Sequence, residues 1–125
     1  MTLPIRTYRD LQVWQQLMDL VTDCYRITRD FPRNEMYGLA SQLQRAAVSI
    51  PSNIAEGHGR DSTKDYIRHL SIAYTSLMEL ETQLLIAERL QYLNKNGADQ
   101  LIIRTTALAK MINALKRSLT RKLNS

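Results

Sequence analysis

The sequence predicts an all-α fold, namely an antiparallel, up-and-down four-helix bundle with a left-handed twist. Only four glycines and three prolines occur among 125 residues, roughly half of their usual share of about 12%, which argues against a turn-rich β-sandwich or barrel. Apolar residues instead recur at spacings of three and four, the period of one helix face. They do so over four segments, at about residues 8–30, 33–57, 62–93 and 97–122. A chain of this length builds one core, so residues 1–125 are expected to form a single domain.

The first helix is expected to begin near Tyr8, because Thr7 and Asp10 are spaced as in a capping box. Two apolar seams follow this helix, about 100° apart. The first seam consists of Leu11, Trp14, Met18, Val21, Tyr25 and Thr28. The second seam consists of Val13, Leu17, Leu20, Cys24, Ile27 and Phe31. A helix of a monomeric bundle needs one such stripe, so the second seam is a candidate oligomer interface; deep burial inside the chain's own bundle explains the pattern equally well.

The second helix is separated from the first by Phe31-Pro32, because a residue before proline is driven out of the α region. Small residues are frequent along this helix, which permits close approach of a neighbouring helix. Pro51 lacks a backbone donor, so a kink or a local break is expected there. Gly57-His58-Gly59 is expected to end the helix with the left-handed backbone of a C-terminal cap.

The third and fourth helices show the most regular spacing. Ser62 and Asp65 are again spaced as in a capping box, and Asn94-Lys-Asn-Gly97 predicts a turn between the two helices. The seam of the third helix consists of Tyr66, Leu70, Ala73, Leu77, Leu80, Leu84 and Ala87. The seam of the fourth helix consists of Leu101, Thr105, Leu108, Ile112, Leu115 and Leu119. Alternating steps of four and three are typical of helices in a left-handed bundle.

The net charge of +5 is concentrated near the C-terminus. Residues 1–99 carry 11 basic and 12 acidic side chains, whereas residues 100–125 carry six basic and no acidic ones. On the fourth helix, Lys110, Arg117 and Arg121 are predicted to face away from the core, with Lys116 beside them. Such an excess of positive charge indicates an anionic partner, since Lys and Arg neutralise phosphate groups.

A second basic group stands at the start of the third helix. It consists of Arg60, Lys64 and Arg68, at a helix end where free backbone N–H groups favour anions. Both groups are candidate nucleic-acid-binding sites. The alternative is that both are ordinary solvated helix faces. Aromatic stacking platforms are not evident, so base-specific recognition of single strands is not expected.

No catalytic, metal or cofactor site is predicted. His58 and His69 lack the Glu three residues earlier that di-metal bundles use, and Cys24 lies on an apolar seam, as a small core residue would. Glu56 and His58 are the one polar pair that suggests catalysis, and a solvated helix end explains them better. No apolar run reaches the roughly 18 residues that span a bilayer, and no signal-peptide core is present. A cytoplasmic protein without a membrane partner is expected.

Several motifs in the first three helices are shared with one group of bacterial proteins. They are Asp10-Leu-Gln-Val-Trp14, Tyr25-Arg-Ile-Thr-Arg-Asp-Phe-Pro32, Glu35-Met-Tyr-Gly-Leu39, Gln42-Leu-Gln-Arg-Ala-Ala-Val-Ser-Ile-Pro-Ser-Asn-Ile-Ala-Glu-Gly57, Arg60-Asp-Ser62, Asp65-Tyr66 and Ser76-Leu-Met-Glu-Leu80. The sequence resembles the 23S rRNA intervening-sequence proteins, relatives of the accessory variability determinant of diversity-generating retroelements. This resemblance implies a homopentameric barrel of four-helix bundles with a nucleic-acid-binding role. In the retroelement relatives the implied partners are RNA or DNA and a reverse transcriptase.

The sequence therefore favours a non-enzymatic, oligomeric bundle that binds RNA or DNA through phosphate contacts, independently of nucleotide sequence. The alternative is a structural or adaptor pentamer that binds a protein such as a polymerase and does not bind nucleic acid directly. An enzyme is the third hypothesis, and it requires Glu56, His58 and a neighbour to converge in one closed pocket.

Overall fold

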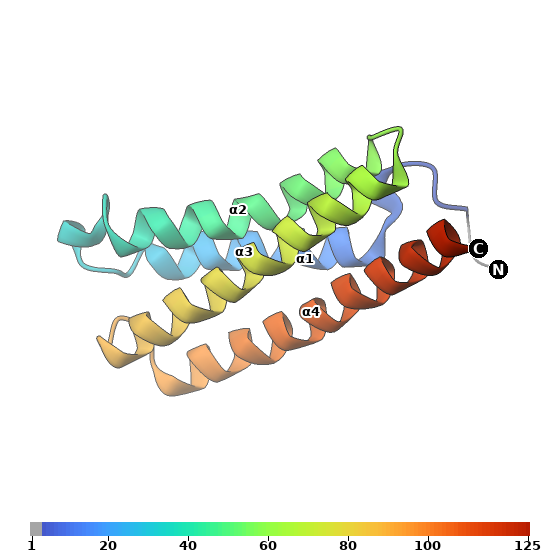
Figure 1. Cartoon of the computed structure of the whole chain (residues 1–125). Helices are drawn as coiled ribbons and strands as arrows, with labels where there is room; N and C mark the ends of the chain where they lie inside the picture. Colours follow the sequence, from blue (N-terminus) through green and yellow to red (C-terminus); the bar gives the residue numbers. More distant parts are fainter. Residues whose placement is uncertain (1–3) are drawn as a thin grey trace.

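The computed structural model describes residues 4–125. It contains four long helices, α1 Gln12–Thr28, α2 Leu39–His58, α3 Thr63–Arg89 and α4 Lys95–Asn124, and two 3₁₀ turns, η1 Tyr8–Asp10 and η2 Arg33–Glu35. No strand occurs within the described range. Successive helices run antiparallel and lie side by side (Figure 1). The prediction of an all-α fold built from four helices is confirmed.

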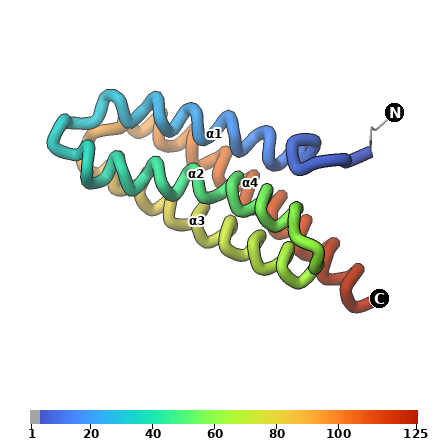
Figure 2. Tube along the Cα trace, turned by 90° about the horizontal axis from the view of Figure 1, so that it is seen from above, coloured from blue at the N-terminus to red at the C-terminus, as the bar shows by residue number. Residues whose placement is uncertain are grey.

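The two ends of the bundle are built differently (Figure 2). At the two-loop end, residues 29–38 connect α1 to α2 and residues 90–94 connect α3 to α4. At the one-loop end, residues 59–62 connect α2 to α3, and both the start of α1 and the end of α4 lie there as well. Three stretches that are distant in the sequence therefore meet at the one-loop end.

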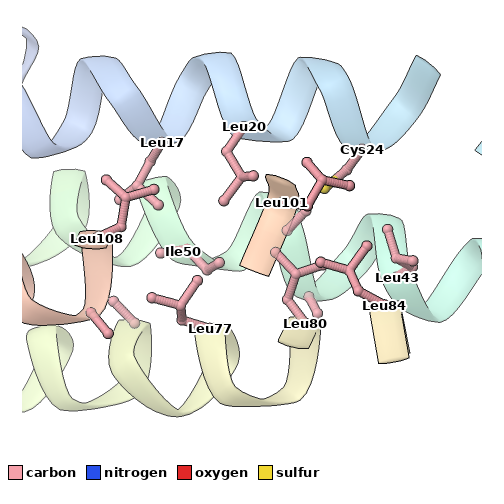
Figure 3. Close-up of a cluster of buried hydrophobic side chains, with 14 of the residues drawn as sticks. Leu17, Leu20, Cys24, Leu43, Ile50, Leu77, Leu80, Leu84, Leu101 and Leu108 are labelled. Carbon is pink, nitrogen blue, oxygen red and sulfur yellow. The ribbon is translucent and has the colours of Figure 1, made fainter. Parts of the chain in front are cut away.

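The core is built from apolar seams of all four helices (Figure 3). Each helix contributes at least one large side chain that is no more than 2% exposed, for example Leu17, Ile50, Leu77 and Leu108. The seams predicted for α3 and α4 are buried, except that Tyr66, Leu115 and Leu119 are half-buried. Removal of this apolar surface from water is the main force that holds the helices together.

On α1 the structure corrects the predicted oligomer interface. The six residues concerned are Val13, Leu17, Leu20, Cys24, Ile27 and Phe31, and all except the half-buried Ile27 are buried within the chain itself. The more exposed seam is the other one, in which Met18 and Tyr25 are 41% and 42% exposed. The spacing shows that two seams exist, but it does not say which of them faces the centre of the bundle.

Capping side chains set where the helices begin. Thr7 and Asp10 form the predicted capping box, although it caps the turn η1 and α1 begins two residues later. α4 begins two residues before the predicted position 97. The reason is that the Asn94 side chain accepts a hydrogen bond from the Gly97 N–H, so the turn cluster is itself the first turn of the helix.

α2 begins at Leu39, six residues after the predicted start at 33, because Arg33–Glu35 form the 3₁₀ turn η2 instead of the first turn of the helix. α2 also differs from the prediction at two positions further along. The helix runs through Pro51 without a break, and Pro51 is buried. The predicted left-handed cap is not formed, because Gly59 has a φ of −80° and no glycine in residues 4–125 has a positive φ. Gly57 serves a different purpose: a Cβ atom there would lie 2.7 Å from the Cβ of His69 and 2.9 Å from the Tyr66 ring. Close packing of α2 on α3 therefore requires the glycine.

Polar contacts close the two-loop end. α3 ends in a left-handed residue, Gln91, with a φ of 65°. The Gln91 N–H donates to the Glu88 carbonyl and the Tyr92 N–H to the Ala87 carbonyl, each at 2.9 Å, which is the pattern of a Schellman cap. The Tyr92 hydroxyl then donates to Glu35 Oε2 at 2.9 Å. This bond ties the α3–α4 connection to the α1–α2 connection.

Candidate nucleic-acid interface

The second half of α4, which leads to the C-terminus (Figure 1), carries a row of basic residues. Lys110, Arg117 and Arg121 are exposed, as predicted, and Lys116 is half-buried beside them. From Lys110 to Arg121 the helix rises about 17 Å, at 1.5 Å per residue. None of the four forms an ion pair with another residue in the described range. This α4 row, Lys110, Lys116, Arg117 and Arg121, is therefore free to bind an anion.

A shallow hollow of about 450 Å³ lies along the α4 row. It is lined by Asn113, Lys116, Arg117, Thr120 and Arg121. The Thr120 hydroxyl donates to the Lys116 carbonyl at 2.8 Å, so Asn113 supplies the uncharged donor that remains. The sequence analysis missed Asn113 and Thr120, although both stand three or four residues from Arg117 and hence on its face of the helix. Cationic and amide donors together are the groups that hold phosphate oxygens.

Arg104 shows how a basic residue of α4 behaves when it serves the fold. Its Nη1 atom donates to Asp23 Oδ2 of α1 at 2.7 Å, and Asp23 Oδ1 also accepts from Arg26 at 2.9 Å. The hydrogen bond from Arg104, helped by the charges of both arginines, lowers the pKa of the Asp23 carboxyl. Arg104 thus links α4 to α1 and is not part of the α4 row.

The second predicted group lies at the start of α3. Arg60 and Lys64 are exposed and form no ion pair within residues 4–125, whereas Arg68 Nε lies 3.8 Å from Asp65 Oδ1. The Ser62 hydroxyl accepts a hydrogen bond from the Asp65 N–H at 3.3 Å, which satisfies one donor of the first turn. The remaining N–H groups of that turn favour an anion nearby.

Both groups lie in stretches that run to the one-loop end, although Lys110 stands midway along α4, and the N-terminal segment lies at that end as well (Figure 2). We call the whole set the basic cluster: Arg6, Arg9, Arg60, Lys64, Arg68, Lys110, Lys116, Arg117, Arg121 and Lys122. The stretches that form this end, 4–15, 52–70 and 110–125, hold ten basic and four acidic side chains, a net charge of +6. The rest of the chain holds seven basic and eight acidic side chains, a net charge of −1. The entire excess of positive charge therefore lies at one end of the bundle.

Most acidic side chains at the one-loop end are engaged locally. Asp10 accepts the backbone N–H groups of Arg6 and Thr7 at 2.9 and 3.1 Å, and these bonds lower the pKa of its carboxyl. Asp65 and Glu56 each face a side chain of the α2–α3 hairpin. None of the three pairs with the α4 row, so they leave its charge uncompensated.

The aromatic rings of the one-loop end pair with one another. Tyr8 and Trp14 meet edge to face with ring centroids 5.2 Å apart, and His58 and Tyr66 do so at 5.7 Å. Burial raises the pKa of Tyr66 to about 12. These four rings, each half-buried, are occupied by their mutual contacts, so contact with the phosphate backbone is the mode of nucleic-acid binding that this end favours.

A chain of hydrogen bonds joins α2 to α3. His69 Nδ1 lies 3.0 Å from Asn53 Oδ1, Asn53 Nδ2 donates to Ser49 Oγ at 3.1 Å, and Ser49 Oγ lies 2.9 Å from Ser76 Oγ. Since Asn53 Oδ1 only accepts, His69 Nδ1 is the nitrogen that carries the proton. Sequence reasoning missed this chain, because its members come from two helices and show no local motif.

The Glu56–His58 pair is not formed. Glu56 Oε2 lies 3.8 Å from His69 Nδ1, whereas His58 packs against Tyr66. Glu56 and His58 thus face different neighbours, and the convergence that the enzyme hypothesis requires does not occur. Burial raises the pKa of the Cys24 thiol to about 12, which removes its nucleophilic character at neutral pH.

An apolar groove of about 320 Å³ runs between α1 and α2. It is lined by Tyr8, Trp14, Met18, Val21, Val48, Pro51, Ser52 and Ala55. Met18 and Val48 are 41% and 40% exposed. Other large apolar side chains, such as Leu85 and Ile103, are exposed elsewhere on the bundle, so the groove is one of the exposed apolar surfaces that a further subunit or another protein can cover.

No cluster of three or more His, Cys, Asp or Glu side chains suited to a metal ion occurs within residues 4–125. Over the same range, no helix combines the length and the apolar character that a bilayer crossing demands.

Comparisons with known proteins agree with the fold. The model of one protein family, described as 23S rRNA-intervening sequence protein, matches residues 9–114. The chain is also similar to a crystal structure of a protein with unknown function from the S23 ribosomal protein family of Bacteroides thetaiotaomicron. The two chains are 20% identical, the match covers 83% of this chain and 97% of that one, and the TM-score is 0.75. No curated protein matches the chain.

Proposed function

The chain belongs to the 23S rRNA-intervening sequence protein family, and we propose that it is a non-enzymatic bundle that binds RNA or DNA through the phosphate backbone. One observation carries the proposal: the α4 row lies in a stretch, 110–125, that has five basic and no acidic residues, and none of the five forms an ion pair within residues 4–125. The absence of acidic residues sets this stretch apart from other unpaired basic residues, such as Arg29 beside Asp30, and gives it a local positive field that attracts a polyanion.

Binding of this kind has a defined physical signature. Each phosphate that a Lys or Arg neutralises releases condensed counterions, so affinity falls steeply as salt concentration rises. Contacts to phosphate oxygens carry no sequence information. The α4 row spans about 17 Å, which corresponds to roughly five nucleotide steps of one strand at 3.4 Å each. Three to four phosphates per chain are therefore within reach of the row.

Assembly into a homopentamer is part of the proposal. The supporting feature is the apolar groove between α1 and α2, because Met18 and Val48 would lose their exposure to water in a contact with another copy. A ring of identical subunits would repeat the basic cluster five times and multiply its field. The left-handed twist of the bundle stays a prediction of the spacing.

An adaptor function is the second candidate, and the same groove favours it. A protein partner such as a polymerase, with an apolar helix that fits between α1 and α2, would bury Met18 and Val48 equally well. In that case the α4 row would not contact nucleic acid. Co-purification of a protein partner from nuclease-treated extracts, without bound nucleic acid, would support this alternative.

The test is binding of a labelled RNA and of a 20-base-pair duplex DNA at several salt concentrations. We expect the logarithm of affinity to fall linearly with the logarithm of salt concentration, with a slope of about −3 for three or four contacts. The triple variant Lys110→Glu, Arg117→Glu and Arg121→Glu should lose binding at 0.1 M salt.

The matched control reverses three exposed arginines of the two-loop end, Arg29, Arg33 and Arg89, which changes the net charge by the same amount. It should retain most of the affinity. Absence of binding by the unchanged protein at low salt, or binding that does not respond to salt, would overturn the proposal. Light scattering after size exclusion tests assembly separately, since a 14.4 kDa species would contradict the pentamer.

A further inference from the structure

We infer that nucleic acid binds across the one-loop end as a whole, so that the α4 row, the start of α3 and the N-terminal arginines contact one stretch of phosphate backbone. The two-loop end takes no part. This inference rests on the proposed function and extends it, because α4 alone is sufficient for that function. It identifies the remaining contact residues as Arg6, Arg60 and Lys64.

The topology brings these residues together. α3 begins at the end where α4 finishes, because the two helices run antiparallel (Figure 2). Arg60 lies in the only connection at that end, and Lys64 lies in the first turn of α3. Both are exposed. A polyanion that follows the α4 row towards its C-terminus therefore runs towards the end of the bundle at which α3 begins.

The N-terminal segment is fixed at the same end. Asp10 accepts the Arg6 N–H at 2.9 Å, which anchors the backbone at this arginine. Tyr8 lines the α1–α2 groove together with Ala55 and thereby packs the segment against α2. The Arg6 side chain is exposed and forms no ion pair in the described range. Its charge is thus held beside the α2–α3 connection.

The one-loop end differs from the rest of the bundle in net charge. The one-loop stretches carry a net charge of +6, while the rest of the chain carries −1. Exposed charges act over about 8 Å at physiological ionic strength. A phosphate backbone at the one-loop end therefore meets mainly positive charge, whereas at the two-loop end Arg29, Arg33 and Arg89 are balanced by nearby acidic residues such as Asp30 and Glu88. Electrostatic attraction should therefore turn the one-loop half of the bundle towards the polyanion.

The experiment compares two triple variants outside α4 that change the net charge equally. One carries Arg6→Glu, Arg60→Glu and Lys64→Glu at the one-loop end. The other carries Arg29→Glu, Arg33→Glu and Arg89→Glu at the two-loop end. Affinity for the 20-base-pair duplex and its salt dependence are measured for both, and circular dichroism verifies that each variant folds. For the first variant we expect at least a tenfold loss of affinity. Its salt slope should be about −3, the value for the α4 row alone, whereas the unchanged protein should show about −6 if seven residues contact phosphates. For the second we expect less than a threefold loss.

The outcomes distinguish this inference from the proposed function. If the α4 triple variant loses binding while the first variant retains it, α4 is the whole site and the inference is wrong, although the proposed function stands. Equal losses for both variants outside α4 would show that overall charge governs binding, and would also overturn the inference. Stronger retention by vesicles that contain phosphatidylserine than by the duplex, at equal ionic strength, would assign the one-loop end to a lipid surface instead.

Discussion

The two ends of this bundle differ in how their charges are balanced. At the two-loop end and in the half of the bundle next to it, several charged and polar groups are bonded across the fold or along a helix: Arg104 with Asp23, Tyr92 with Glu35, and Lys95 with Asp99 at 3.0 Å. Arg29, Arg33, Arg45 and Arg89 form no ion pair in the described range, but acidic residues are as numerous as basic ones in that part of the chain. At the one-loop end, nine of the ten members of the basic cluster form no ion pair within residues 4–125. α2 and α3 approach each other closely at that end, where Gly57 faces His69 and Tyr66.

The difference separates groups that stabilise the fold from groups that are available to a ligand. A basic side chain with a carboxylate partner stabilises the folded chain, so its removal should lower the free energy of unfolding. Removal of a basic side chain that has no carboxylate partner should change the free energy of unfolding little, but it should weaken ligand binding. A paired arginine such as Arg104 and an unpaired one such as Arg117 thus have different roles, and measurements of unfolding can tell them apart.

The largest expected effect on stability is at the one-loop end itself. Gly57→Ala places a Cβ 2.7 Å from the Cβ of His69, which is too close to the backbone of α3 to move aside cheaply. Although alanine favours a helix, we expect a net loss of about 2 kcal/mol in the free energy of unfolding, measured by urea titration.

The matched control is Gly59→Ala, two residues away. Its nearest atoms would be the Ala55 and Glu56 carbonyl oxygens at 3.5 and 3.6 Å, and its φ of −80° suits any residue. We expect no loss, or a gain of about 0.5 kcal/mol. Equal effects of the two substitutions would refute the role assigned to close packing at Gly57.

Gly57 also shows what the sequence could and could not provide. The sequence indicated that a helix ends near this glycine, because Gly-His-Gly is typical of a cap, and α2 does end at His58. It could not indicate that Tyr66 and His69 of α3 press on the glycine, because that contact depends on how two helices approach. The same limit applies to α1, where two seams are visible and only tertiary packing decides that the Val13 seam faces inward.

In the candidate site, the sequence was sufficient to predict the α4 row, but it was not sufficient to predict the whole basic cluster. Acid-free composition and helical spacing identified Lys110, Arg117 and Arg121, since all of them lie on one helix. That Arg6 and Arg9 stand at the same end as Arg60 follows only from the topology. By sequence, Arg104 is one of the six basic residues that give the C-terminal stretch its excess of positive charge. In the structure it pairs with Asp23, which lies 81 residues earlier in the sequence.

At the two-loop end, removal of the Tyr92 hydroxyl tests the bond between the two connections. Tyr92→Phe should lower the melting temperature by about 2–4 °C, because the Glu35 carboxylate loses its donor. Tyr37→Phe is the control, since Tyr37 is 92% exposed and its substitution should leave the melting temperature unchanged.

The bond to Glu35 raises the pKa of Tyr92 above its ordinary 10.0. Its stabilisation should therefore be complete below pH 10 and disappear as the pH rises through the raised pKa, a loss that Tyr92→Phe should abolish.

A smaller effect on stability is expected when a single arginine of α4 is neutralised. Two variants are compared, one in each half of the bundle. Arg104→Gln should lower the free energy of unfolding by roughly 0.5–1 kcal/mol, a modest value because both partners are about one-third exposed. Arg117→Gln should change it by less than about 0.3 kcal/mol. If both variants lose stability equally, the contrast between the two ends fails.

The Arg104–Asp23 pair also predicts a pH dependence. The folded pKa of Asp23 lies below its ordinary value of 3.8, so the stabilisation is complete above that value. It is lost as the pH falls from about 4 through the lowered pKa. Unfolding measured between pH 5 and pH 2.5 should therefore show a shallower decline for Asp23→Asn than for the unchanged chain. Asp19→Asn, an exposed position on the same helix without an ion pair in the described range, should retain the full decline.

The smallest expected effect is a gain, at the Schellman cap of the two-loop end. Gln91 adopts a φ of 65°, where a side chain other than glycine is strained by about 1 kcal/mol. Gln91→Gly relieves this strain but adds freedom to the unfolded chain, which offsets roughly half of the gain. We expect a rise of about 0.5 kcal/mol in the free energy of unfolding. Gln100→Gly, in the interior of α4, should instead lower it by about 1 kcal/mol. A loss at both positions would mean that the Gln91 side chain stabilises the two-loop end through contacts that outweigh its backbone strain.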